Sequence, residues 1–252
     1  MPVVSTPAGD IFYLGRGRGD TALICVHGAG GTHAHWGYQM RDLSDASLIY
    51  TIDLPGHGRS APPGRTTIAE YGAALLDMLD VLGLERAALA GHSMGGAIAL
   101  WATLQAPERV AGLGLVGTGG RLRVAPAILD GLSRDLLATI RLIVGYSYAP
   151  TAPARMRLRA EESYAECDPI VYRGDFIASN GFDILARLPE IGCPTVVVCG
   201  TKDRMTPPKY SEALRDAIPG ATMALVPGAG HMVMIEQPAA VSAALRALLS
   251  RL

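Results

Sequence analysis

The sequence is short of lysine, and its positive and negative charges nearly cancel. Of the 22 basic residues among 252, only Lys202 and Lys209 are lysines, and 23 acidic residues bring the formal net charge to −1. A chain without a basic surplus offers little attraction to a polyanion, so we exclude nucleic acid as a partner. Hydrophobic residues make up 49% and charged residues 18% of the chain, proportions that exclude a disordered protein.

Paired cysteines and long apolar runs are also missing. The cysteines, at positions 25, 167, 193 and 199, have no spacing typical of a zinc site or a disulfide framework. We expect all of them to be reduced. Residues 1–7 lack a basic leader, and no apolar run is long enough to span a bilayer. The sequence therefore predicts a cytoplasmic protein, and it carries no feature that sets the number of subunits.

Short apolar runs alternate with longer amphipathic segments along the chain. We expect strands at residues 10–14, 22–26, 48–52, 87–90, 113–116, 195–199 and 223–226. We expect helices at residues 34–44, 67–82, 94–105, 208–217 and 238–250. This alternation predicts an α/β fold, a mostly parallel sheet with helices on both faces. Because no helix separates the first strands, we expect an antiparallel edge there, with a surface hairpin at residues 15–19.

The alternation stops between residues 121 and 189. This stretch is rich in proline and aromatic residues, and its pieces 126–143 and 154–166 have helical periodicity. We interpret it as a helical cap inserted into a core formed by residues 1–120 and 190–252. In an open α/β sheet the ligand crevice lies beyond the C-terminal ends of the strands, where such an insertion forms a roof. We expect its side chains to contact the substrate, in particular Tyr146, Met156 and Phe176.

Residues 91–96 read GHSMGG and join a strand candidate to a helix candidate. A chain that turns this sharply holds the serine in strained backbone angles, so its neighbours must be small. The turn exposes the hydroxyl of Ser93, and the helix N-terminus behind it offers N–H groups to a developing negative charge. Ser93 is therefore a candidate nucleophile, provided that an acid and a histidine follow it in the chain.

Six histidines compete for the role of general base. His27 lies in a glycine loop, His33 and His35 at a helix start, and His57 in the turn at residues 53–58. His92 lies beside the nucleophile, where the sharp turn at residues 91–96, the nucleophile elbow, directs its side chain away from the Ser93 hydroxyl. His231 instead follows the last strand, on a glycine-rich loop that can carry an imidazole over the strand ends. We predict that His231 takes the proton of Ser93.

The acid of such a triad is expected between the serine and the histidine, in a loop after a strand. Asp203 meets this condition, because the strand at residues 195–199 runs directly into it. The loop after the preceding strand, residues 117–120, contains no carboxylate. Asp53 precedes the nucleophile and Asp216 belongs to a charged helix face, so both are weaker candidates. We predict that Asp203 accepts the second imidazole N–H and stabilises the imidazolium.

The loop at residues 27–31 reads HGAGG and follows the strand at residues 22–26. Its glycines allow backbone N–H groups to approach a ligand closely. A glycine turn that binds nothing would have the same sequence, so the interpretation depends on the elbow. We expect one donor to an oxyanion from this loop and the second from Met94, the residue after the nucleophile.

Together these segments resemble the α/β-hydrolase superfamily, in order and on both sides of the cap. The resemblance is carried by HGAG at residues 27–30, DLPGHGRS at 53–60, the elbow, GTKD at 200–203, and GHM at 230–232 with Glu236 and Pro238 beyond it. It implies an eight-stranded, mostly parallel sheet. It also implies that residues 53–60 are structural, and that Ala29 is the oxyanion donor of its loop with Gly30 as second choice.

The resemblance narrows the chemistry. Dehalogenases and epoxide hydrolases of this fold carry aspartate at the elbow, whereas this chain carries Ser93. What remains is acyl transfer through an acyl-enzyme, without a cofactor, on a small-molecule ester. The chain looks like carboxylesterases and monoacylglycerol-lipase-like enzymes. Enol-lactone hydrolases and carbon–carbon bond hydrolases share the core and stay open as alternatives, as does a non-catalytic ligand receptor on the same scaffold.

Overall fold

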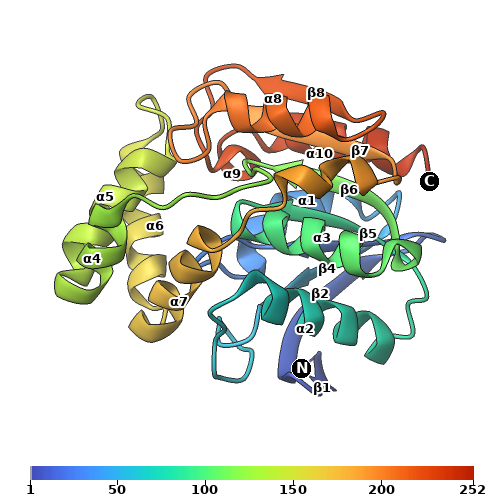
Figure 1. The fold of residues 1–252 in the computed structure, drawn as a ribbon, viewed down its shortest axis with the longest axis horizontal. Coiled ribbons are helices and arrows are strands. Elements are labelled where there is room, and N and C mark those ends of the chain that lie inside the picture. The colour runs from blue at the N-terminus through green and yellow to red at the C-terminus, as the bar shows by residue number, and fades with distance from the viewer. Residues whose placement is uncertain (1) are drawn as a thin grey trace.

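An eight-stranded sheet forms the centre of the computed structural model, which describes residues 2–252 (Figure 1). The strands are β1 Val3–Thr6, β2 Gly9–Gly17, β3 Ala22–Val26, β4 Leu48–Ile52, β5 Ala87–His92, β6 Val110–Val116, β7 Thr195–Gly200 and β8 Thr222–Val226. Their order across the sheet is β1-β2-β4-β3-β5-β6-β7-β8. Strands β3 to β8 are parallel, whereas β1 and β2 are antiparallel. The expected mostly parallel sheet with an antiparallel edge is confirmed.

Helices cover both faces of the sheet, as the alternating sequence predicts. Around the sheet lie η1 His33–Trp36, α1 Gly37–Leu43, α2 Ile68–Val81, α3 Met94–Gln105, η2 Pro107–Arg109, α8 Pro208–Ala217, α9 Val233–Glu236 and α10 Pro238–Leu249. Successive residues of β3 pack into two different cores. Ile24 and Val26 join the core under α2, α3 and α8, and Leu23 and Cys25 join the core under α1 and α10. The strand is therefore apolar throughout, because both of its faces are buried.

The remaining helices gather at one side of the sheet, where Figure 1 shows them standing apart from its two layers. They are α4 Pro126–Arg134, α5 Leu136–Ser147, α6 Ala154–Ala165 and α7 Pro169–Asn180, followed by η3 Leu185–Glu190. An isolated antiparallel bridge joins Arg121 to Asp183. The chain therefore leaves the sheet and returns to it at neighbouring points. All four helices thus belong to one insertion between β6 and β7, called the helical excursion below.

Several local expectations were wrong. Residues 15–19 do not form a hairpin between paired strands, because β4 lies between β2 and β3. The hairpin of this region joins β1 to β2, and β1 was not expected. The periodic stretch 126–143 is broken at Asp135, whose side chain accepts the Ala138 N–H and starts a second helix. Helix α7 was also missed, although Asp168 followed by Pro169 is a helix-start signal.

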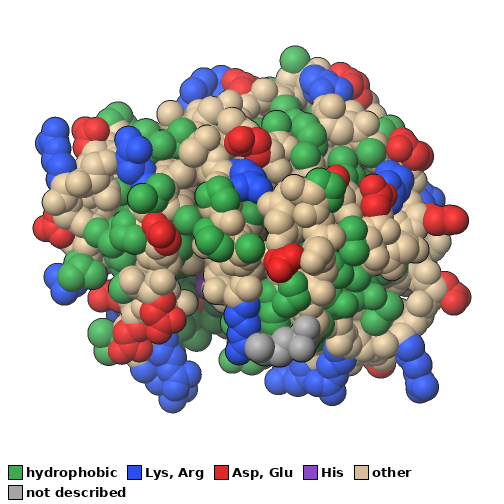
Figure 2. Space-filling model, turned by 90° about the horizontal axis from the view of Figure 1, so that it is seen from below, with side chains coloured by type: hydrophobic (Ala, Val, Ile, Leu, Met, Phe, Trp, Pro, Cys, Tyr) green, Lys and Arg blue, Asp and Glu red, His purple; other side chains and the backbone are tan. Residues whose placement is uncertain are grey.

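The surface and the cysteines agree with what the composition indicates. On the face drawn in Figure 2, side chains of both charges lie among apolar ones. All four cysteines are free, as expected, and Cys25 and Cys199 are buried. Within residues 2–252, no helix combines the length and the apolar character that crossing a bilayer needs.

Candidate active site

The elbow forms where β5 ends and α3 begins. Ser93 has φ 53° and ψ −117°, the one positive φ of a non-glycine residue within residues 2–252. The glycines around it are required by close approach: a Cβ on Gly91 would collide with the carbonyl of Gly95, and a Cβ on Gly95 with the carbonyl of Val26. The strained turn is held by the N–H of Ser93, which donates to the Val116 carbonyl at 2.9 Å. The predicted backbone strain is therefore present at Ser93.

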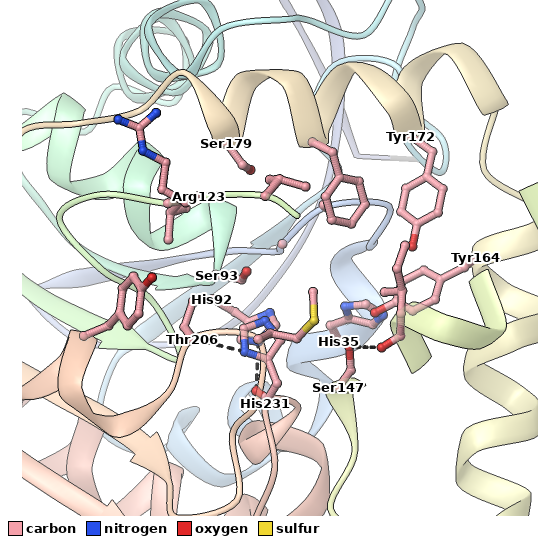
Figure 3. Close-up of a pocket in the computed structure, with 18 residues that line it drawn as sticks. His35, His92, Ser93, Arg123, Ser147, Tyr164, Tyr172, Ser179, Thr206 and His231 are labelled. Atoms are coloured by element: carbon pink, nitrogen blue, oxygen red, sulfur yellow. Dashed lines mark hydrogen bonds between the residues drawn. The ribbon is translucent and has the colours of Figure 1, made fainter. Parts of the chain in front are cut away.

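Ser93 opens into a cavity that also contains His231. The space between the lining atoms, with its mouth included, is about 670 Å³, a size typical of small-molecule sites. One end is formed by backbone and side chains of the strand ends, including Gly28, Ala29 and His92. Much of the remaining wall comes from the helical excursion, through Ile143, Ser147, Tyr164, Tyr172, Phe176 and Ser179. Ser93 and His231 lie on the same side of this cavity (Figure 3).

Asp203 lies behind His231, with its side chain fully buried. The His231 Nδ1 is 2.9 Å from Asp203 Oδ2, and the hydroxyl of Thr206 donates to the same oxygen at 2.9 Å. The other oxygen, Oδ1, accepts the backbone N–H groups of Met205 and Thr206, both at 2.9 Å. Because Nδ1 faces a carboxylate, it carries the ring proton, and Nε2 keeps its lone pair. Thr206, which was not expected from the sequence, fixes the carboxylate and is 3.2 Å from the imidazole.

The glycine loop after β3 lies beside Ser93. Within residues 2–252, the backbone N–H groups of Ala29 and Met94 have no hydrogen-bond acceptor. The N–H of Gly30, in contrast, donates to Asp175 Oδ2 at 2.8 Å. Gly30 is therefore occupied, and this geometry favours Ala29 over Gly30 as the free donor of the loop.

Asp175 of α7 is a buried carboxylate that sequence reasoning did not single out. Besides the Gly30 N–H, it accepts the Tyr71 hydroxyl at 2.7 Å and faces His57 Nε2 at 2.8 Å. The other ring nitrogen of His57 faces the Pro55 carbonyl. Burial alone would lower the pKa of His57, but the charge and hydrogen bond of Asp175 outweigh it and raise this pKa. Asp175 thus connects α7 to residues 53–60 through a buried ion pair and to the glycine loop through the Gly30 N–H.

His92 lies in the wall of the same cavity. Its Nε2 donates to the carbonyl of His231 at 3.0 Å, and the two rings are 4.6 Å apart. Burial lowers the pKa of His92 well below its usual value, and the neighbouring His231 lowers it further. His92 is therefore neutral and holds the backbone of His231 in place.

Of the three side chains expected to contact substrate, Phe176 lines the cavity. Tyr146 does not: its side chain lies outside, under the guanidinium of Arg204 at 4.9 Å. It precedes the cavity-lining Ser147, and one residue rotates a helix position by about 100°. Met156 lines a separate hollow beside Glu236. Sequence periodicity did not reveal which face of each helix the fold turns toward Ser93.

Comparisons with known proteins identify the family of the chain. Residues 23–244 match the Alpha/beta hydrolase family. The acetyltransferase component of the acetoin cleaving system of Cupriavidus necator is 29% identical over 89% of this chain, which spans 62% of that protein. A putative carbamate hydrolase, RutD of Caulobacter sp. strain K31, is 33% identical over 90% of both chains. A solved thermophilic esterase superimposes with a TM-score of 0.87 at 31% identity, covering 99% of this chain and 97% of its own.

Proposed function

Because the chain belongs to the alpha/beta hydrolase family, we propose that it is a serine hydrolase that cleaves small to medium carboxylic esters. One observation carries the proposal. A single cavity contains the strained Ser93 and His231, and the Nδ1 contact of His231 with Asp203 leaves its Nε2 able to take a proton. The similarity to a thermophilic esterase supports the same reaction class.

In the first half of the reaction, the Ser93 oxygen attacks the ester carbonyl carbon while Nε2 of His231 takes the hydroxyl proton. Asp203 stabilises the resulting imidazolium. The negative charge that develops on the carbonyl oxygen is met by the N–H groups of Ala29 and Met94, which have no acceptor within residues 2–252. When the intermediate collapses, the carbon–oxygen bond to the alcohol breaks and the imidazolium protonates the leaving oxygen.

In the second half, a water molecule attacks the acyl-enzyme and gives its proton to His231. The tetrahedral intermediate collapses to the free acid, and the Ser93 oxygen recovers its proton from the imidazolium. Both halves use the same oxyanion donors, so the Asp175 contact with Gly30 supports the reaction indirectly by holding the loop beside Ala29.

We assign residues 121–189 to a cap over a core of residues 1–120 and 190–252. The cap supplies the apolar side chains Leu122, Val124, Ile143 and Phe176 to the cavity. Each buried methylene of an acyl chain gains up to about 0.8 kcal/mol until the cavity is full. Activity is therefore expected to rise with acyl length and then to fall.

Phe176→Ala is expected to move the acyl-length optimum toward longer chains, because removal of the ring enlarges the cavity. The measurement is kcat/KM for a series of aryl esters from acetate to dodecanoate. Tyr146→Ala and Met156→Ala are matched controls from the same excursion whose side chains lie outside the cavity. Their profiles should follow that of the wild type. If Phe176→Ala also leaves the profile unchanged, the acyl chain is bound elsewhere.

The direct test of the proposal combines turnover with covalent labelling. We expect hydrolysis of a chromogenic short-chain ester and stoichiometric labelling of Ser93 by a fluorophosphonate, located by peptide mass spectrometry. Ser147 and Ser179 line the same cavity and serve as internal controls that stay unlabelled. Turnover without a label on Ser93 would contradict the mechanism. Absence of both would favour a ligand receptor on a hydrolase scaffold.

Hydrolysis of an enol-lactone or a carbon–carbon bond is the alternative, and it depends on an arginine that binds a substrate carboxylate. Arg123 lines the cavity, so it is the candidate. Its side chain is 60% exposed and lies 4.0 Å from Asp183, with a further hydrogen bond to the Asn180 carbonyl. Because its charge is already opposed, we favour the ester. An enol-lactone and a vinylogous diketone belong in the substrate panel, and their preference over esters would reverse this choice.

A further inference from the structure

Three aromatic side chains form a continuous part of the cavity wall. The ring of His35, from η1, meets Tyr164 of α6 edge to face at 6.2 Å, and Tyr164 stacks on Tyr172 of α7 at 5.6 Å. All three line the cavity that contains Ser93. Figure 3 shows the Tyr172 hydroxyl pointing from α7 toward the part of the cavity near His35 and Tyr164.

This wall contains polar atoms without partners. The Tyr172 hydroxyl and His35 Nδ1 are buried, and neither has a hydrogen-bond partner within residues 2–252. The Tyr164 hydroxyl has only the sulfur of Met232, at 3.7 Å. Buried hydroxyls are normally paired, as that of Tyr71 is by Asp175. An unpaired buried donor costs folding free energy, and a ligand group that accepts its hydrogen bond removes that cost.

The wall is uncharged. Burial raises the pKa of the Tyr172 hydroxyl well above its usual value, so the group keeps its proton. Burial also lowers the pKa of His35 to about 4, so its imidazole is neutral at pH 7. No positive charge at this wall could balance a carboxylate or phosphate, and moving such an anion out of water would be unfavourable. The matching ligand group is a neutral one.

The wall lies close to the reacting centre. A Cβ on Gly30 would contact the rings of Tyr172 and Tyr164, the latter at 3.2 Å, so both rings pack directly against the glycine loop. The neighbouring residue of that loop is Ala29, the proposed oxyanion donor. A substrate whose carbonyl lies at Ala29 therefore presents atoms only a few bonds away to this wall.

We propose that Tyr172, in one wall with Tyr164 and His35, forms a specificity site for an uncharged hydroxyl or carbonyl oxygen a few bonds from the scissile ester carbonyl. The Tyr172 hydroxyl donates its hydrogen bond to that oxygen. The proposal rests on the proposed function and narrows its substrate class. The preferred substrates are hydroxy- or oxo-substituted esters, and simple alkyl esters are hydrolysed less efficiently.

The test compares aryl butanoate with the aryl esters of 2-hydroxybutanoic, 3-hydroxybutanoic and 3-oxobutanoic acids. For the wild type we expect a higher kcat/KM for at least one oxygenated ester than for butanoate. Tyr172→Phe removes only the unpaired hydroxyl, and it should lower this preference about 10-fold, the effect of one lost hydrogen bond. Tyr146→Phe, which removes a hydroxyl outside the cavity, should keep the wild-type preference.

Thermal unfolding provides the second readout. Because the Tyr172 hydroxyl has no partner, its removal should leave Tm unchanged or raise it, whereas Tyr71→Phe removes a paired hydroxyl and should lower Tm. An unchanged substrate preference in Tyr172→Phe, or no preference in the wild type, overturns the specificity site alone. Failure to hydrolyse any ester of the panel overturns the proposed function and the specificity site with it.

Discussion

Ser93→Ala is expected to lower kcat for ester hydrolysis by a factor on the order of 10³ to 10⁶ while the chain stays folded. The variant removes the attacking oxygen and leaves His231, Asp203 and both oxyanion donors in place. Members of a triad act as a unit, so the remaining groups recover little of the rate. The measurement is kcat for a short-chain aryl ester. Active-site titration of the preparation checks for contaminating wild-type enzyme.

The elbow geometry makes this variant a clean one. Alanine must adopt the same positive φ as Ser93, and both residues carry a Cβ, so the backbone strain is similar in the two proteins. Ser147→Ala is the matched control, because this serine lines the same cavity and its hydroxyl bonds the Ile143 carbonyl. Wild-type turnover in a folded, uncontaminated Ser93→Ala preparation would show that Ser93 is not the nucleophile.

Asp203→Asn is expected to lower kcat by roughly 10⁴, the effect of holding a catalytic histidine in the wrong tautomer. The surroundings of Asp203 determine how asparagine must orient. Its amide oxygen has to face the N–H groups of Met205 and Thr206, because an NH₂ group there would meet two donors. The NH₂ group then faces His231 Nδ1 and donates to it. Nδ1 loses its proton, Nε2 gains one, and the imidazole cannot accept the proton of Ser93.

The control for this variant is Asp216→Asn. Asp216 lies on α8 and pairs with Arg215 on the surface, so its variant should keep wild-type kinetics. Asp53 is the carboxylate whose variant could contradict this assignment. Its carboxylate accepts the N–H groups of His33 and Arg59, a structural arrangement. If Asp203→Asn retained full activity while Asp53→Asn lost it without unfolding, the acid of the triad would have been assigned wrongly.

Local signals account for the helices that cover the sheet. The ends of α2, α3, α8 and α10 lie within one residue of the expected ones. The helix expected at residues 34–44 is instead the short η1 followed by α1, and η2 and α9 were not expected. Helix α2 starts with a capping box between Thr67 and Glu70, and α8 and α10 begin with proline. Such signals are contained in a few neighbouring residues, so they can be read without the fold.

Strand pairing was harder to anticipate. Every residue of β5 and β6 is buried, and an apolar run contains no information about its neighbour in the sheet. The chain reverses its order near β3 and β4, so the strands on either side of residues 15–19 are separated by another strand. Sequence adjacency therefore suggested a hairpin that does not exist.

The sequence by itself determined which strand ends carry the candidate chemistry. The strain at Ser93 demands small neighbours, and Asp203 and His231 each follow a strand, so residue type and chain order were sufficient to select them. Only the tertiary structure decided what surrounds them. Asp175 meets Gly30 across 145 residues and His57 across 118. The rotation of α5 and α7 places Tyr146 outside the cavity and Tyr172 in its wall. Helix rotation and packing angle depend on contacts between distant segments, and no local pattern encodes them.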